Sequence, residues 1–254
     1  MDLLFPDFTT TELLLALLIA VLSGFVKGVV GFAMPLILIS GLTLFIAPEL
    51  ALAGLILPTL ITNAMQALRQ GRRAAWDSIR RFRVFLISGG ITLFITAQFV
   101  RAVPDDLFNL ILGIPVIFFS LLQLFGITFN LAGQSARVEA FVGGFAGAMG
   151  GIAGFWGPPT VAYLSAIHTS KNDQMRIQGV IYGLGAVALL GAHVGSGVLR
   201  AETWPFSAAL ILPAVLGMWL GGRVIDRIDQ HTFRHATLLV LLVAGLNLIR
   251  RGLF

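Results

Sequence analysis

Gly24-x-x-x-Gly28-x-x-Gly31-x-x-x-Pro35 and Gly147-x-x-x-Gly151-x-x-Gly154-x-x-x-Pro158 are two copies of one pattern, with identical spacing. Gly147 follows Gly24 by 123 residues in a chain of 254. Both copies lie in stretches that are too apolar for water and too rich in glycine for an uninterrupted helix. We predict that each copy interrupts a membrane helix near the bilayer midplane, and that a short new helix begins at the proline.

The composition is that of a polytopic membrane protein. Hydrophobic residues make up 57% of the chain and charged residues 11%, whereas about a quarter of a typical soluble domain is charged. The chain has no cysteine, which excludes disulfides and thiolate metal sites. The histidine spacings do not indicate a metal site, so we expect neither a metal nor a cofactor.

Ten apolar runs follow one another as five and then five, and they predict an all-α membrane protein built from two repeats. The runs are 12–31, 34–46, 49–69, 83–101, 106–127, 138–155, 158–168, 174–199, 205–222 and 236–249. Runs 34–46 and 158–168 are too short to cross a hydrocarbon core of about 30 Å, so we interpret them as half-helices. The first repeat is predicted to occupy residues 1–130 and the second residues 131–254.

The basic residues predict the orientation of the chain. An odd number of crossings per repeat gives the two repeats opposite, inverted topologies. Arginines cluster around the predicted loop 70–82, which places that loop in the cytoplasm and the N-terminus in the periplasm. Since the basic residues lie in short loops between apolar runs, the pattern favours a membrane protein over nucleic-acid binding.

The two interruptions predict an anion site. Backbone N–H groups at the start of a helix are unpaired and carry a partial positive charge, which suits a small oxyanion. The alternative is that the glycines are only close-packing faces of helices, as we expect for Gly179/Gly183, Gly191/Gly195 and Gly217/Gly221. The candidate substrate-binding residues from the two copies are Gly28, Gly31, Phe32, Ala33 and Met34, and Gly154, Phe155, Trp156 and Gly157.

Lys27 is the only lysine inside an apolar run. A charge at that depth is expensive and therefore points to a function, here neutralisation of a bound anion. The alternative is that Lys27 extends its ammonium group to the membrane interface.

Four further residues are candidates for the site. Asn63 and Gln66 share a helix face and either donate hydrogen bonds to a ligand or bridge helices. Tyr182 and His193 are eleven residues apart and so lie on nearly the same face of one run. His193 either carries a coupling proton or is an interhelical histidine.

Two stretches of the second half support a resemblance to a known family. They are 154–166, Gly-Phe-Trp-Gly-Pro-Pro-Thr-Val-Ala-Tyr-Leu-Ser-Ala, and 174–186, Gln-Met-Arg-Ile-Gln-Gly-Val-Ile-Tyr-Gly-Leu-Gly-Ala. With the repeated glycine pattern and the basic loop, nearly the whole chain resembles the TauE/SafE family of sulfite and organosulfonate exporters. The resemblance implies a bacterial inner-membrane permease for small sulfur or carboxyl anions, without a prosthetic group. Phe32 and Met34 depart from the consecutive glycines that the family usually has before the first proline.

The leading hypothesis is export of sulfite or a C2 sulfonate such as sulfoacetate by alternating access of the two repeats. The alternatives are a proton-coupled importer of a small organic anion and a half-helix anion channel. Motifs of hydrolases, metalloproteases and nucleotide-binding enzymes are missing from the sequence, so we expect a protein that is not an enzyme. The expected partners are the small anion, the lipid bilayer, protons in the coupled alternatives and a second copy of the chain in a homodimer.

Overall fold

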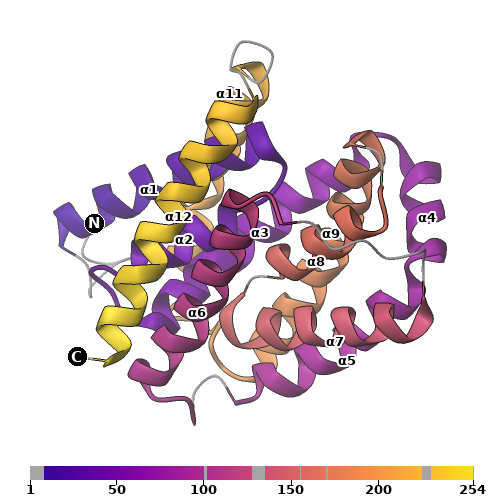
Figure 1. Ribbon diagram of the computed structural model, residues 1–254. Helices are drawn as coiled ribbons and strands as arrows, with labels where there is room; N and C mark the ends of the chain where they lie inside the picture. Colours follow the sequence, from indigo (N-terminus) through magenta and orange to yellow (C-terminus); the bar gives the residue numbers. More distant parts are fainter. Residues whose placement is uncertain are drawn as a thin grey trace.

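The computed structural model describes residues 9–99, 102–127, 135–154, 156–169, 171–224 and 230–253, and within these ranges all regular structure is helical (Figure 1). The helices are α1 (Thr10–Val30), α2 (Met34–Leu42), α3 (Pro48–Leu68), α4 (Arg72–Arg81), α5 (Arg83–Ala97), α6 (Asp105–Leu124), α7 (Ala136–Ala153), α8 (Gly157–Ala166), α9 (Lys171–Gly195), α10 (Trp204–Ala209), α11 (Ile211–Val224) and α12 (Gln230–Leu253). Five segments in the described ranges are long and apolar enough to cross a membrane: Thr10–Val29, Pro48–Leu68, Asp106–Leu124, Arg176–Gly195 and Trp204–Arg223. The predicted all-α, polytopic membrane architecture is therefore confirmed.

The prediction of a loop over 70–82 is wrong, because Arg72–Arg81 form helix α4. Arg72 and Trp76 on this helix are exposed, whereas Ser78 is buried. The Ser78 hydroxyl accepts a hydrogen bond from Arg176 Nε of α9, at 3.3 Å. A helix this short gains its stability from such tertiary contacts rather than from an apolar run, so the hydropathy pattern did not indicate it.

The ninth predicted run is divided into α10 and α11 at Leu210. Pro213 lies in the first turn of α11. Proline has no backbone N–H, so it cannot bond to the carbonyl of Ala209, four residues earlier, and the regular hydrogen-bond ladder is interrupted there.

The helices of the two halves pack against one another in a reciprocal arrangement. The most extensive contacts are α5 with α7, α1 with α11, α6 with α12 and α3 with α9. Figure 1 shows α5 and α7 side by side along the lower edge of the molecule. Each of these pairs joins a helix of residues 1–130 to a helix of residues 131–254, so the core is shared between the two halves.

Glycines bring α1 and α11 into close contact. A Cβ atom on Gly24 or Gly28 would overlap a backbone carbonyl oxygen of α11, that of Ala214 or Met218. The relation is mutual, because a Cβ atom on Gly221 would overlap the carbonyl oxygen of Phe25. Gly24 and Gly28, four residues apart, therefore form a helix-packing face on α1.

The second copy of the pattern makes the same kind of contact between α7 and α5. A Cβ atom on Gly147 would overlap the carbonyl oxygen of Gly89. Two hydroxyl groups of α5 then bond across the contact, Thr92 Oγ1 to the Gly144 carbonyl at 2.7 Å and Thr96 Oγ1 to the Ala148 carbonyl at 3.0 Å. The first two glycines of each copy thus serve helix packing.

Gly217→Ala should destabilise the protein, and Gly222→Ala should not. A Cβ atom on Gly217 would overlap the carbonyl oxygen of Val21 on α1, whereas a Cβ atom on Gly222 meets nothing within 4 Å. Both changes raise helix propensity by about 1 kcal/mol, but forced separation of α1 and α11 costs about 1–3 kcal/mol. Unfolding in detergent measures the difference, and equal stability of the two variants would contradict the α1–α11 contact.

Candidate functional site

The first interruption lies between α1 and α2. Gly31 ends α1 in the left-handed conformation, with φ 81°, and its N–H donates to the Lys27 carbonyl at 2.8 Å. Ala33 precedes α2 with φ 74°, a conformation that costs a non-glycine residue on the order of 1–2 kcal/mol. Pro35 follows as the second residue of α2. The predicted break at the first glycine pattern is confirmed.

The second interruption lies between α7 and α8 and has a similar form. Gly154 ends α7 with φ 70°, and its N–H donates to the Gly150 carbonyl at 2.9 Å. Helix α8 begins at Gly157, and the Trp156 carbonyl accepts a hydrogen bond from Thr160 Oγ1 at 2.8 Å. The predicted second break is also confirmed, while Phe155 lies outside the described residues.

The two helix starts differ in the amide groups that they offer. In the first turn of α2, the amides of Met34 and Leu36 have no acceptor within the helix. Pro35 contributes no N–H group. In α8 the second and third residues are Pro158 and Pro159, which leaves Gly157 as the only amide among the first three positions. The second half of the predicted amide site is therefore poorer in donors than the first.

Lys27 is buried within α1, with 2% of its surface exposed. Its ammonium group donates a hydrogen bond to Asn63 Oδ1 on α3. Within the described part of the chain, no carboxylate forms an ion pair with it. The interpretation that Lys27 reaches the membrane interface is therefore wrong, because the group points into the protein.

The polar face of α3 holds the surroundings of Lys27 together. Asn63 Nδ2 donates to the Tyr182 carbonyl on α9 at 3.2 Å, and Gln66 Nε2 donates to the Gly31 carbonyl at 2.9 Å. Both predicted amide side chains bridge helices in this structure. Asn63 thus connects the buried ammonium group on α1 to the backbone of α9.

One cavity gathers residues from both interruptions. Its volume is about 20 Å³, and the residues that line it are Lys27, Phe32, Ala33, Pro35, Leu36, Asn63, Trp156, Gly157 and Tyr182. Tyr182 Oη donates to the Gly157 carbonyl at 3.4 Å. The Tyr182 ring also meets the Trp156 ring edge-on, with centroids 6.4 Å apart. The structure therefore brings the start of α2 and the start of α8 to the same small space.

Pro35 and Leu36 line this cavity although they were not predicted to do so. They are the second and third residues of α2, and the first turn of a helix surrounds whatever lies at its start. That rule would have indicated both positions.

Several predicted site residues lie outside the group that lines the cavity. The side of Gly28 on which a Cβ atom would lie packs against α11, and the same side of Gly154 packs against Leu52 and Leu55 of α3. Met34 is fully buried, and its Sδ atom accepts a hydrogen bond from Thr62 Oγ1 at 3.6 Å. Gly31 and Gln66 do not line the cavity, and they are joined to each other by the hydrogen bond from Gln66 Nε2 to the Gly31 carbonyl.

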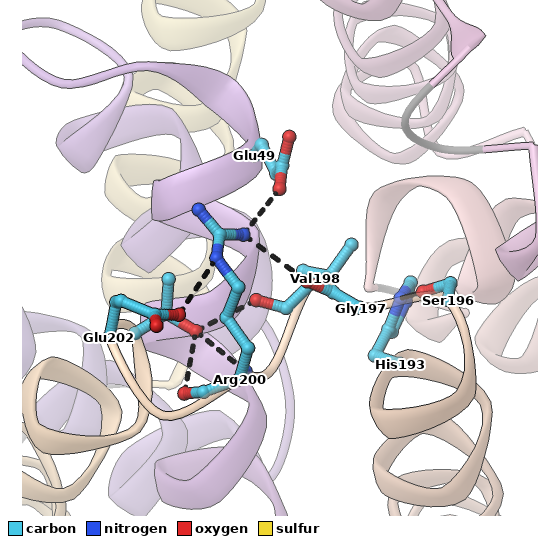
Figure 2. A network of polar contacts seen from close by, with 8 residues as sticks. Glu49, His193, Ser196, Gly197, Val198, Arg200 and Glu202 are labelled. Carbon is cyan, nitrogen blue, oxygen red and sulfur yellow. Dashed lines mark hydrogen bonds and ion pairs between the residues drawn. The ribbon is translucent and has the colours of Figure 1, made fainter.

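His193 also lies away from the cavity, near the end of α9. It is fully buried, and its Nδ1 atom lies 3.3 Å from Ser196 Oγ. Figure 2 shows it beside the turn that leads to Arg200. Arg200 Nη1 bonds Glu49 of α3 at 2.8 Å, and its Nε bonds Glu202 at 3.1 Å. The end of α9 is thereby tied to the start of α3, and His193 belongs to this end of the helix pair.

The comparisons with known proteins agree with this architecture. A family model described as "Sulfite exporter TauE/SafE" matches residues 16–248, a range that contains both interruptions and every residue of the cavity. No curated protein and no solved structure matches the chain.

Asn63→Leu should destabilise the protein, because it leaves the buried Lys27 ammonium group without its hydrogen-bond partner. A buried unsatisfied group costs about 1–3 kcal/mol, and more when it is charged. Adding Lys27→Met removes that stranded charge, so the double variant should be more stable than the sum of the single changes by about 0.5–3 kcal/mol. Denaturant unfolding in detergent measures this coupling.

The matched control pairs Asn63→Leu with Lys171→Met. Lys171 is the first residue of α9, eleven residues before Tyr182 and so about 16 Å along the helix. The control pair should be additive. Additive behaviour of the Lys27 pair as well would refute the contact between Lys27 and Asn63.

Proposed function

Because the chain belongs to the sulfite exporter TauE/SafE family, we propose that it exports sulfite or a C2 organosulfonate such as sulfoacetate across the bacterial inner membrane. In this proposal the anion binds between the starts of α2 and α8, against the ammonium group of Lys27. The observation that carries the proposal is the burial of that ammonium group with no carboxylate partner among the described residues.

The charge balance favours an anionic ligand. An isolated ammonium group in a low-dielectric interior loses several kcal/mol of hydration, and a nearby negative charge recovers much of that loss. Asn63 supplies only a neutral oxygen. A bound anion supplies the full opposite charge, and it gives Lys27 a role that helix packing does not need.

The hydrogen-bonding groups around the cavity suit a ligand that only accepts hydrogen bonds. The Lys27 ammonium group has three N–H donors, of which Asn63 accepts one. The start of α2 adds amides and the positive end of the helix dipole. Sulfite and sulfonate groups present three oxygen acceptors and a negative charge, so they match this set in number and in sign.

The size of the cavity sets a mechanical condition on binding. A volume of 20 Å³ is enough for about one water molecule, and an oxyanion with three oxygens is larger. Binding therefore requires displacement of a wall. Phe32 and Trp156 belong to the two interrupted segments, and movement of these rings opens the cavity without breaking a helix.

Alternating access of the two halves explains why the site lies where it does. We propose that residues 1–130 and 131–254 are inverted repeats, and the reciprocal pairing of α1 with α11 and of α5 with α7 supports this. The α3–α9 pair lines the cavity with Asn63 and Tyr182, and the ion pair of Arg200 with Glu49 joins the two helices at one end. Tilting of one half against the other about this pair would expose the cavity to each side in turn.

The distribution of arginines supports an orientation with α4 in the cytoplasm and the N-terminus in the periplasm. Exposed Arg72 and Arg73 lie on α4, and positive residues concentrate on cytoplasmic segments. Outward movement of an anion is then favoured by about 2.3 kcal/mol per charge for each 100 mV of inside-negative potential. Export in this sense needs no coupling ion, in contrast to import.

Lys27→Met should abolish sulfite transport, because the anion then enters an apolar site without its counter-charge. Lys171→Met, which removes the only other lysine of the chain, should transport at close to the wild-type rate. Tracer flux from vesicles with an imposed voltage and no pH gradient measures both. Full flux by Lys27→Met would contradict the site, and flux that depends on a pH gradient alone would favour proton-coupled import.

Gly157→Ala should weaken substrate binding while leaving the fold intact. A Cβ atom on Gly157 would lie 3.8 Å from Phe32 and from Tyr182 Oη, which are ordinary contact distances, so it fills cavity space without a clash. We expect a rise in KM of about tenfold, since a site this small loses room for an oxygen atom. Gly144→Ala, with its nearest contact at 3.6 Å on Thr92, is the control outside the cavity. An unchanged KM in Gly157→Ala would remove α8 from the site.

A further inference from the structure

A second and much larger cavity lies between α5, α7 and α9. Its volume is about 390 Å³, and we refer to it as the α5–α7–α9 crevice. We propose that this crevice binds one acyl chain of an anionic phospholipid, with the lipid headgroup held at Arg83. The inference depends on the membrane location of the chain and on the proposed orientation with α4 in the cytoplasm, and not on the proposed transport function.

The walls of the crevice are suited to a hydrocarbon chain. Of the described residues that line it, only Arg83 is charged. At its rim, Ile87 and Leu184 are 62% and 41% exposed, so the opening continues an apolar surface that faces lipid in a membrane. An inorganic anion would meet too few hydrogen-bond donors along these walls.

Glycine creates the free space in the crevice. Gly90 of α5 lines it, and a Cβ atom there would meet nothing within 4 Å. A helix with its side chains is about 10–12 Å across, whereas an acyl chain is a single flexible chain of carbon atoms. A single flexible chain therefore suits a crevice between three helices better than a helix of a second copy does.

Arg83 gives the site its preference for a negative headgroup. It is the first residue of α5 and is exposed, and it forms no hydrogen bond or ion pair with the part of the chain that the structure describes. The exposed arginines of α4 lie directly before it, with Asp77 as the acidic residue of that helix. Guanidinium groups bind phosphate oxygens in a bidentate manner, and the cytoplasmic leaflet is rich in anionic lipid.

Trp156 forms the wall between the crevice and the smaller cavity, since its side chain lines both. A Cβ atom on Gly185 would lie 2.9 Å from the indole, and one on Gly150 would lie 2.6 Å from it. The indole therefore packs directly against the backbone of α9 and of α7 at these two glycines. An acyl chain in the crevice would contact this indole, which makes Trp156 a direct reporter of its presence.

Quenching of Trp156 fluorescence by brominated lipid tests the proposal. The variant Trp76→Phe/Trp204→Phe/Trp219→Phe keeps Trp156 as the only tryptophan. In phosphatidylcholine vesicles, lipid with brominated acyl chains should quench it at about fivefold lower mole fraction as phosphatidylglycerol than as phosphatidylcholine. This corresponds to the attraction of one arginine to an anionic headgroup.

Two pairs of variants separate the crevice from the general surface. Gly90→Leu fills the crevice and should abolish the quenching, whereas Gly222→Leu on α11, where a Cβ atom also meets open space, should preserve it. Arg83→Gln should remove the fivefold preference, whereas Arg73→Gln on α4 should keep most of it. Native mass spectrometry of the wild-type chain gives a second readout: phosphatidylglycerol should remain bound, and Gly90→Leu should release it.

The proposal is overturned by any of three results. The first is a folded single-tryptophan variant that brominated lipid does not quench, together with a wild-type chain that retains no lipid. The second is equal quenching by the two lipids, which would show that Arg83 does not select the headgroup. The third is a dimer that Gly90→Leu dissociates, which would show that a second copy of the chain covers the crevice.

Discussion

The buried ammonium group of Lys27 is the constraint on which the rest of the site depends. On insertion scales a lysine at the centre of a membrane helix costs roughly 2.5–3.5 kcal/mol. The ammonium group is hydrogen-bonded to a neutral side chain, Asn63, and not to a carboxylate among the described residues. A neutral partner supplies no negative charge to balance the ammonium group. Two helix starts and three aromatic residues, Phe32, Trp156 and Tyr182, line the small cavity next to Lys27.

The glycine pattern performs two separate tasks within one short stretch. Its first two glycines let α1 pack tightly on α11, and α7 on α5. Its third glycine, Gly31 or Gly154, turns the chain out of the helix in the left-handed conformation. The two tasks support each other, because the tight crossing holds the last turn of each long helix while the chain bends. This explains why the same spacing occurs twice in a fold whose halves pack reciprocally.

Much of this arrangement could be predicted from the sequence, because a few residues carry strong local signals. A proline that follows a glycine-rich apolar stretch indicates a helix start, and a lysine in such a stretch indicates a functional site. These two signals located both interruptions and the cavity residues Lys27, Phe32, Ala33, Trp156 and Gly157. Asn63 and Tyr182 were predicted separately, as polar residues on the faces of two other apolar runs.

Other features depend on the direction of a side chain or on contacts between distant helices. Gly28 is part of the same motif as Gly31, but it packs against α11. His193 shares a helical face with Tyr182, yet three helical turns separate it from the cavity, at the end of α9 that Arg200 ties to α3. Helix α4 has no apolar run, since it is stabilised by its contacts with α9. None of these relations follows from spacing along the chain.

The most direct test of the central claim is to locate a bound anion in an experimental structure. Crystals grown with selenite, an anomalously scattering analogue of sulfite, would show its position without ambiguity. The account predicts one strong anomalous peak within hydrogen-bonding distance of Lys27 Nζ, between the first turns of α2 and α8. A peak elsewhere, with Lys27 paired to a carboxylate of the protein, would contradict it.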